Sequence, residues 1–142
     1  MTPSIRLTLT PQPAETEALL EGLRTTEKPN LPKGDGYQQM ALFVDSPGEA
    51  GPARTGLYGY ALFDWFYVEF LHVAPEWRGQ GLGTRLIEEA AAWCRIRGLV
   101  GMWLQTMDFQ ARGFYEKQGF TLIATHAGRP VGSATHFMER RF

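Results

Sequence analysis

The chain has 142 residues, with 44% hydrophobic and 20% charged residues, so we expect one folded domain over residues 1–142 and exclude wholesale disorder. The net charge is -1, which argues against nucleic acid as the main partner, because a phosphate backbone needs a basic protein face. No apolar run reaches the ~20 residues of a membrane helix, no secretory signal pattern precedes the first strand, and Cys94 is the only cysteine. We therefore expect a cytoplasmic protein that has no internal disulfide and does not enter a membrane.

The first third of the chain predicts a strand, a helix and a loop. Ile5, Leu7 and Leu9 alternate with polar residues, which is typical of a short strand. Leucines on one helical face predict a helix over Ala14–Arg24. The prolines and glycines of Thr25–Tyr37 predict a loop or a lid.

The next segment predicts three strands in succession. Met40–Val44 is followed by a connection rich in proline and glycine, Ser46–Pro52, which indicates a hairpin. Leu57–Phe63 and Phe66–Val73 are rich in aromatic and β-branched residues, with a tight turn expected at Asp64-Trp65.

The second half of the chain predicts two helices and three strands. Apolar residues recur every four positions in a helix that ends at Gly98: Leu82, Leu86, Ala90 and Cys94. Val100–Gln105 reads as a buried strand, and Asp108 is expected to cap a helix that ends near Gln118. Phe120–Ala124 and Ala134–Met138 read as final strands. The predicted fold class is therefore α/β, a mixed sheet with helices on its faces.

The junction between the strand Phe66–Val73 and the following helix predicts an anion site. The turn Arg78–Thr84 places glycines at 79, 81 and 83, which would let the backbone approach a pyrophosphate. Free N–H groups and the positive end of the helix dipole face this turn, and Arg78 adds a charge that can pair with phosphate. The alternative interpretation is a tight turn without a ligand.

Two other phosphate motifs do not fit these residues. A P-loop requires a Gly-Lys-Ser/Thr ending, which is absent. The dinucleotide fingerprint requires G-x-G-x-x-G, whereas this turn has G-x-G-x-G. Too little chain follows the turn for a dehydrogenase, even if Asp108 could contact a ribose.

Two blocks of residues resemble a known family. Leu71–Gly83 is similar to the R/Q-x-x-G-x-G/A signature of GNAT N-acetyltransferases, and Ala111–Phe120 is similar to the second block of that family, in the same order and spacing. The resemblance covers roughly residues 57–125. It implies direct transfer of an acetyl group from acetyl-coenzyme A to an amine in a ternary complex.

The resemblance also implies where the cofactor lies. Pantetheine would lie between two splayed parallel strands, here Phe66–Val73 and Val100–Gln105, against backbone groups near Leu71 and Val73. One backbone N–H would polarise the thioester carbonyl. The implied cofactor-binding residues are Leu71, His72, Val73, Arg78, Gly79, Gln80, Gly81, Leu82, Gly83, Thr84, Gln110 and Tyr115. No metal is implied.

Tyr115 matches the tyrosine that protonates the departing thiolate in this family; the alternative is a half-buried packing aromatic. Many relatives carry Asn where this chain has Asp108. A carboxylate would not favour phosphate there, so we expect Asp108 to cap the helix and Gln110 to make the polar contact instead.

The acceptor amine must lose a proton before attack, because an alkylammonium has a pKa near ~10.4. Glu69 is the candidate base, since it lies on the strand that enters the turn. Strand alternation predicts Tyr67, Glu69 and Leu71 on one face, and neighbouring aromatic rings would partly desolvate the carboxylate and raise its pKa. A solvent-facing Glu69, His72 and a water chain remain alternatives. His126 and His136 could touch substrate, although surface positions are expected for both.

The remaining aromatic residues and the cysteine have simpler interpretations. Cys94 is expected to lie in the core, and Trp93 and Trp103 are expected to be packing aromatics. Trp65–Tyr67 would line either an acceptor pocket or a homodimer surface. The expected acceptor is a small-molecule or peptide amine. A non-catalytic domain that binds acyl-coenzyme A is the alternative function, and Tyr115 together with the intact glycine turn favours the enzyme.

Overall fold

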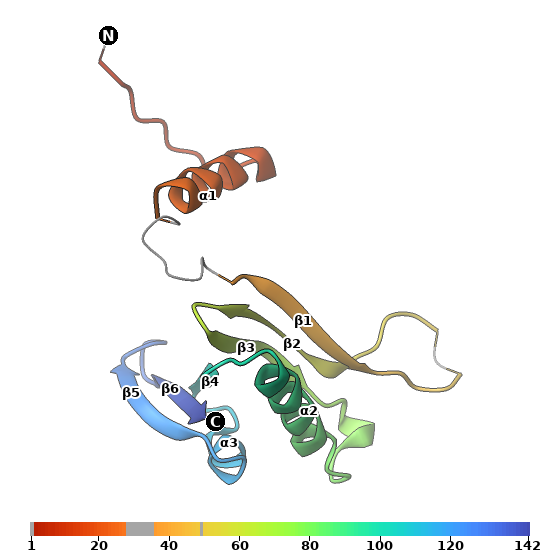
Figure 1. Ribbon diagram of the computed structural model, residues 1–142. Helices are drawn as coiled ribbons and strands as arrows, with labels where there is room; N and C mark the ends of the chain where they lie inside the picture. The colour runs from red at the N-terminus through yellow and green to blue at the C-terminus, as the bar shows by residue number, and fades with distance from the viewer. Residues whose placement is uncertain (1, 28–35, 49) are drawn as a thin grey trace. The chain divides into compact units, whose positions relative to one another are not determined.

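The computed structural model describes residues 2–27, 36–48 and 50–142, which belong to two compact units, Met1–Asp35 and Gly36–Phe142 (Figure 1). One domain over the whole chain stays a prediction. Most of the loop or lid expected over Thr25–Tyr37 lies outside the described residues.

The described residues of the first unit form one helix, α1, which spans Pro13–Glu27 and confirms the predicted helix. The carboxylate of Glu15 accepts a hydrogen bond of 2.9 Å from the Gln12 backbone N–H, so this side chain caps the first turn. Arg6 forms an ion pair with the same carboxylate.

The strand expected around Ile5, Leu7 and Leu9 is wrong. These residues adopt no regular structure, and their side chains are fully or largely exposed. Alternation predicts a strand only where a partner completes the ladder of hydrogen bonds, and no described strand pairs with them.

The second unit is a six-stranded mixed sheet with two α-helices (Figure 1). The strands lie in the order β1-β2-β3-β4-β6-β5. The elements are β1 (Gln38–Val44), β2 (Thr55–Leu62), β3 (Trp65–His72), the short 3-10 helix η2 (Pro75–Trp77), α2 (Leu82–Ile96), β4 (Gly101–Met107), α3 (Arg112–Lys117), β5 (Thr121–Ala127) and β6 (Ala134–Arg141). This arrangement confirms the predicted fold class. None of the described helices is long and apolar enough to cross a bilayer.

The expected hairpins are present, although one turn is shifted by a residue. β1 pairs antiparallel with β2, and β2 pairs antiparallel with β3. The β2–β3 turn consists of Phe63 and Asp64, both with left-handed backbone (φ 51° and 65°), and not of Asp64 and Trp65. Two left-handed residues match the twist of the flanking strands.

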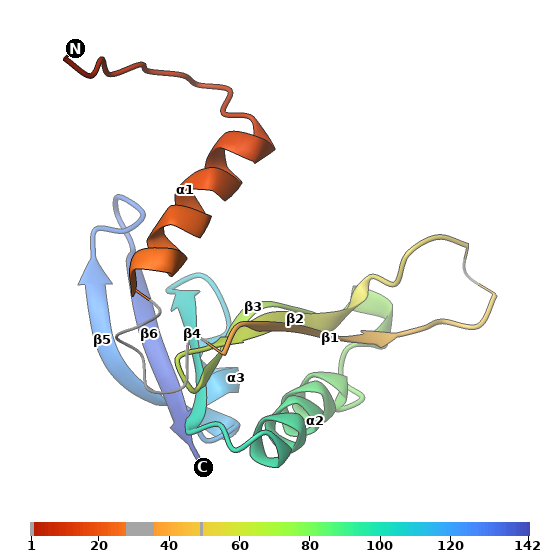
Figure 2. The ribbon, with the colours of Figure 1, turned by 45° about the horizontal axis from the view of Figure 1, so that its top comes forward.

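Helix α2 packs along one face of the sheet, against β2, β3 and β4 (Figure 2). Its predicted apolar stripe is buried: Leu86, Ile87, Ala90, Ala91 and Cys94. Burial raises the pKa of the Cys94 thiol to about 12, so this cysteine is a core residue, as expected. The helix ends before Gly98, whose left-handed backbone (φ 71°) turns the chain toward β4.

Strands β3 and β4 form the one parallel pair of the sheet, and they pair only over their first halves. The first residue pair of the ladder is Trp65 with Gly101, and the last is Val68 with Leu104. Beyond this ladder, β3 continues to His72 and β4 to Met107. Opposite β2, Val68 pairs with Gly59 and Phe70 with Tyr58, so Glu69 is the extra residue of a β-bulge. The two strands therefore diverge after Val68, as the family resemblance implies.

Candidate active site

The glycine turn between η2 and α2 leaves its backbone accessible. Gly79 and Gly81 both have left-handed backbone (φ 75°), and an added Cβ at either position would meet nothing within 4 Å. Gly81 also caps the helix, since its carbonyl accepts the hydrogen bond of 3.0 Å from the Arg85 N–H. The N–H groups of the first turn of α2 have no partner within the helix, and such groups can bind phosphate.

Gly83 has different surroundings from the other two glycines. A Cβ at this position would lie 3.0 Å from Cζ of Phe114. Gly83 lies at the turn, yet the space left by its missing Cβ is next to Phe114, and a role for Gly83 in making room for pyrophosphate stays a prediction. This glycine lets the start of α2 approach α3 closely.

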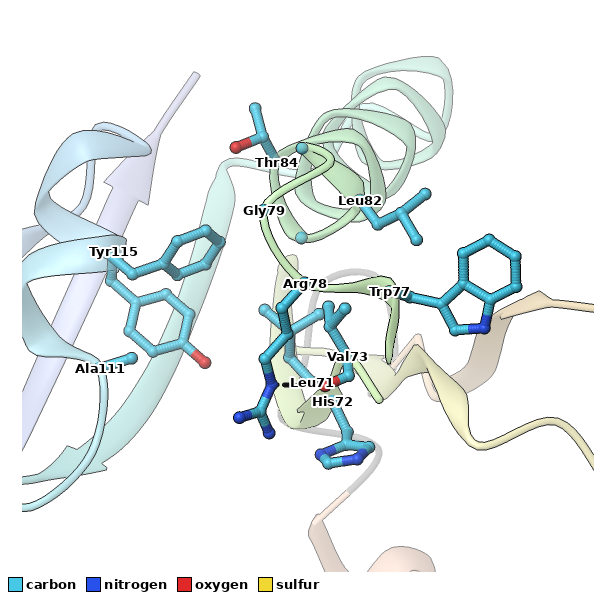
Figure 3. A pocket seen from close by; sticks show the side chains of 13 residues that line it. Leu71, His72, Val73, Trp77, Arg78, Gly79, Leu82, Thr84, Ala111 and Tyr115 are labelled. Carbon is cyan, nitrogen blue, oxygen red and sulfur yellow. Dashed lines mark hydrogen bonds between the residues drawn. The ribbon is translucent and has the colours of Figure 1, made fainter. Parts of the chain in front are cut away.

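A cavity of about 430 Å³ lies between the glycine turn, the end of β3 and helix α3 (Figure 3). All the residues predicted to bind the cofactor line it, except Gln80 and Gln110. Two motifs separated by about thirty residues in the sequence thus meet at one site. Trp77, Ala111 and Phe114 also line the cavity, and sequence reasoning did not assign them to it. All three lie within the two blocks that carried the resemblance, which was the signal available for them.

Arg78 lies at the β3 side of this cavity. Its Nε donates a hydrogen bond of 3.0 Å to the carbonyl oxygen of Val73 (Figure 3). This bond holds the side chain beside the end of β3, and Figure 3 shows the guanidinium on the side away from Gly79 and Thr84. Arg78 thus contributes one positive charge to the lining of the cavity.

Tyr115 lies on the opposite side of the cavity, on α3, and its hydroxyl points toward Leu71 and Val73 (Figure 3). Its ring is half-buried and packs edge-on against Phe114 (5.2 Å between centroids) and Phe120 (5.8 Å). Within the described part of the chain, no hydrogen bond reaches the Tyr115 hydroxyl. Burial raises the pKa of this phenol above its usual 10.0, which keeps the proton on the oxygen at neutral pH.

A second cavity, of about 360 Å³, lies where β3 and β4 diverge. It is lined by Glu69 of the bulge, Thr106 of β4 and Gln110, and it shares Tyr115 with the first cavity. The Oε1 of Gln110 accepts a hydrogen bond of 2.9 Å from the N–H of Met107, the last residue of β4.

The bulge changes the faces expected for β3. The rings of Tyr67 and Tyr60 are in contact (5.5 Å), as are those of Phe70 and Tyr58 (5.8 Å), so Phe70 shares the face of Tyr67. Leu71 packs instead against the core that contains Val68. The alternation that grouped Leu71 with Tyr67 is therefore wrong, because the extra residue at 69 reverses the phase of the strand.

Glu69 is exposed, so the partial desolvation expected of this carboxylate is also wrong. The neighbouring ring of Phe66 lies in the core, edge-on to Trp93 at 5.8 Å, and does not cover Glu69. Phe66 accordingly lines neither an acceptor pocket nor a dimer surface. The Trp103 ring contacts the Tyr67 ring at a tilt of 32°, with 4.3 Å between centroids, and, like Trp93, has the packing role that was expected.

Asp108 does not cap helix α3. The helix starts at Arg112 after Ala111, whereas the Asp108 carboxylate bonds to His136 on β6 and accepts a hydrogen bond of 3.3 Å from Ser133. His136 lowers the pKa of this carboxyl. Asp108 therefore ties the end of β4 to the last hairpin.

The three histidines lie in different surroundings. His136 is buried and also contacts the Thr125 hydroxyl at 3.0 Å, so the surface position expected for it is wrong. His126 is exposed, as expected, and His72 lines both cavities. No group of acidic, histidine or cysteine side chains suited to a metal occurs within residues 2–27, 36–48 and 50–142.

Comparisons with known proteins agree with this geometry. The model of the acetyltransferase (GNAT) family matches residues 22–120. The chain is 40% identical over 94 residues to blasticidin-S acetyltransferase of Streptomyces morookaense, which covers 66% of this chain and 69% of that protein. A solved structure from Agrobacterium tumefaciens, assigned as an acetyltransferase, has a TM-score of 0.85 at 25% identity and covers 98% of this chain and 99% of that one. PaiA N-acetyltransferase of Thermoplasma acidophilum, solved with coenzyme A, has a TM-score of 0.62 at 18% identity, over 91% and 72% of the two chains.

Proposed function

The chain belongs to the GNAT acetyltransferase family, and we propose that it transfers the acetyl group of acetyl-coenzyme A to an amine of a small-molecule acceptor by direct attack in a ternary complex. One observation carries the proposal. The glycine turn at the start of α2 and the Tyr115 hydroxyl on α3 line the same cavity. An anion site and a proton donor are thus close enough to serve one bound molecule.

The described residues fit coenzyme A. Gly79 and Gly81 leave open the space that any other side chain would fill, and the α2 N-terminus and Arg78 supply positive charge for a pyrophosphate. The cleft between the diverging strands is lined by apolar residues such as Val68 and Leu71 and by the amides of Gln105 and Gln110, a mixture that suits the amide-bearing arm of coenzyme A. A structurally similar N-acetyltransferase was solved with coenzyme A, which supports this choice of cofactor.

Three groups of the chain carry the chemistry in this proposal. Bound acetyl-coenzyme A supplies an acetyl group activated as a thioester. Tyr115 holds a proton on its hydroxyl oxygen and donates it to the sulfur that departs. Glu69, on the exposed edge of the cleft, accepts the proton of the incoming amine directly or through water. The backbone at the bulge near Leu71 orients the thioester carbonyl.

The acceptor is proposed from chemistry and from one relative. Blasticidin-S acetyltransferase is named for a small molecule, which supports a small-molecule amine over a peptide. Glu69 and His72 border the cavity from its solvent side, where a cationic amine would enter. A carboxylate at the entrance both attracts such an amine and can take up its proton.

The variant Gly81→Glu tests the cofactor site. Its side chain would enter the phosphate-binding space with a negative charge, so we expect calorimetry to detect no binding of acetyl-coenzyme A. The matched control is Gly98→Glu, because Gly98 has a similar left-handed backbone (φ 71°) and open surroundings at the other end of α2. Both variants carry the same backbone strain, and only Gly81→Glu should lose binding. Equal affinity in the two folded variants would contradict the site.

A further inference from the structure

Thr106 is the residue of the cleft that the proposed function leaves unexplained. It lies on β4 with only 2% of its surface exposed. Its hydroxyl is the single buried side-chain group without a hydrogen-bond partner in the part of the chain that the structure describes. A threonine hydroxyl can donate one hydrogen bond and accept two, and a buried polar group without a partner destabilises the folded state.

The other buried threonines show that this fold normally pairs such groups. The Thr135 hydroxyl donates to the carbonyl oxygen of Arg129 at 2.7 Å, and the Thr55 hydroxyl accepts from the Ala74 N–H at 3.0 Å. Thr106 differs from both because it lines the cavity between the diverging strands, on the wall opposite Glu69 and Leu71. Its missing partner is therefore expected to be something that enters this cavity.

We propose that the Thr106 hydroxyl is a ligand-binding group that forms a hydrogen bond with the pantetheine arm of acetyl-coenzyme A. The inference rests on the proposed function. Among the parts of the cofactor, the arm is favoured because the charged groups that suit phosphate, Arg78 and the α2 N-terminus, line the other cavity. The arm carries neutral amide and thioester groups, and a neutral hydroxyl can pair with these without the cost of burying a charge.

The geometry also explains why β4 carries an unpaired hydroxyl. Tyr115 lines both cavities, so a molecule that extends from the glycine turn into the cleft passes Tyr115 on its way to Thr106. A hydrogen bond at Thr106 would hold the arm at the far end of this path. The stability lost in the free protein is then recovered on binding.

The variant Thr106→Val tests this inference, because valine keeps the shape of threonine and removes its hydroxyl. We expect calorimetry to show about three- to tenfold weaker binding of coenzyme A, the loss of one neutral hydrogen bond. Adenosine 3′,5′-bisphosphate, which lacks the pantetheine arm, should bind to the variant and the wild type equally. The melting temperature of the free variant should equal or exceed that of the wild type.

Thr135→Val is the matched control, since it removes a buried threonine hydroxyl that has a protein partner. It should lower the melting temperature and leave the affinity for coenzyme A unchanged. If Thr106→Val fails to fold, the pair Thr106→Ser and Thr106→Ala gives the same comparison, with the serine variant keeping the affinity.

Three results would overturn the inference. Unchanged affinity for coenzyme A with a lower melting temperature would mean that the hydroxyl holds a structural water. Equal weakening of coenzyme A and the bisphosphate would mean a general distortion of the site. Failure of the wild type to bind coenzyme A at all would overturn the proposed function as well, and this separates the two failures.

Discussion

Burial of the Tyr115 phenol determines what this residue can do. Since its pKa lies above the usual 10.0, the hydroxyl keeps its proton throughout the neutral range and is a donor, not a base. The raised pKa favours the protonated form, and that form is lost only as the pH rises through the folded-state value. Any alkaline limb due to Tyr115 in the pH profile of kcat is therefore expected above pH 10.

The variant Tyr115→Phe should keep the ring contacts with Phe114 and Phe120 and lose the proton donor. We expect kcat to fall ~10²–10⁴-fold, the range for lost general acid catalysis, with little change in the affinity for coenzyme A. Steady-state kinetics and calorimetry measure the two quantities. Tyr58→Phe is the control, because Tyr58 lines neither cavity and its hydroxyl pairs with Gln39. A near-normal kcat for Tyr115→Phe would mean that water supplies the proton.

The variant Glu69→Gln tests the proposed base. It keeps the size of the side chain and removes its basicity, so we expect kcat/KM for a strongly basic amine to fall on the order of 10²-fold. An amine of low pKa arrives already neutral and should lose much less. Glu89→Gln, on the exposed side of α2, removes an acid far from the cleft and should change neither rate. If the variant keeps the wild-type rates with both amines, and the acidic limb of the pH profile of kcat/KM does not move, His72 or solvent takes the proton.

At the scale of elements, the bulge in β3 shapes the cleft. It separates β3 from β4 after Val68 and moves Glu69 out of the regular ladder. Gly59, which pairs with Val68, permits this geometry. A Cβ at Gly59 would lie 2.0 Å from the Tyr67 carbonyl oxygen and 2.8 Å from the Phe66 ring. The strand therefore requires glycine at this position.

The variant Gly59→Ala should consequently destabilise the fold. Overpacking costs about 1–3 kcal/mol and more where backbone atoms collide, so we expect a loss of at least ~3 kcal/mol in the free energy of unfolding. Chemical denaturation measures it. The control is Gly113→Ala in helix α3, where an added Cβ meets nothing within 4 Å and alanine favours the helix. Equal stability of the two variants would contradict the close approach at the bulge.

The elements that depend on local pattern could be predicted from the sequence. The glycine turn and the stripe of α2 follow from spacing alone, and both are present. The bulge at Glu69 could not be predicted, because it depends on the register of β2. The contact between Asp108 and His136 also escaped prediction, since it joins residues 28 positions apart. Patterns within one element are visible in a sequence, whereas pairings between elements are not.

At the scale of the molecule, the site is built from separate motifs that the sheet brings together. The α2 crossover places the glycine turn beside β3, and β4 with α3 places Tyr115 opposite it. Cys94, the one cysteine of the chain, is buried in the core with a thiol pKa of about 12. It is thus not a nucleophile for an acyl-enzyme, which favours direct transfer. A homodimer and a cytoplasmic location stay predictions.

The most direct test of the central claim is the release of free coenzyme A from acetyl-coenzyme A in the presence of a panel of small-molecule amines. Thiol detection follows the release, and mass spectrometry follows the acceptor. The account predicts release only when an amine is present, one acetyl group gained by that amine, no acetyl group on the protein, and no release with Gly81→Glu. Binding of acetyl-coenzyme A without release for any amine would contradict the account and indicate a domain that binds the cofactor without turning it over.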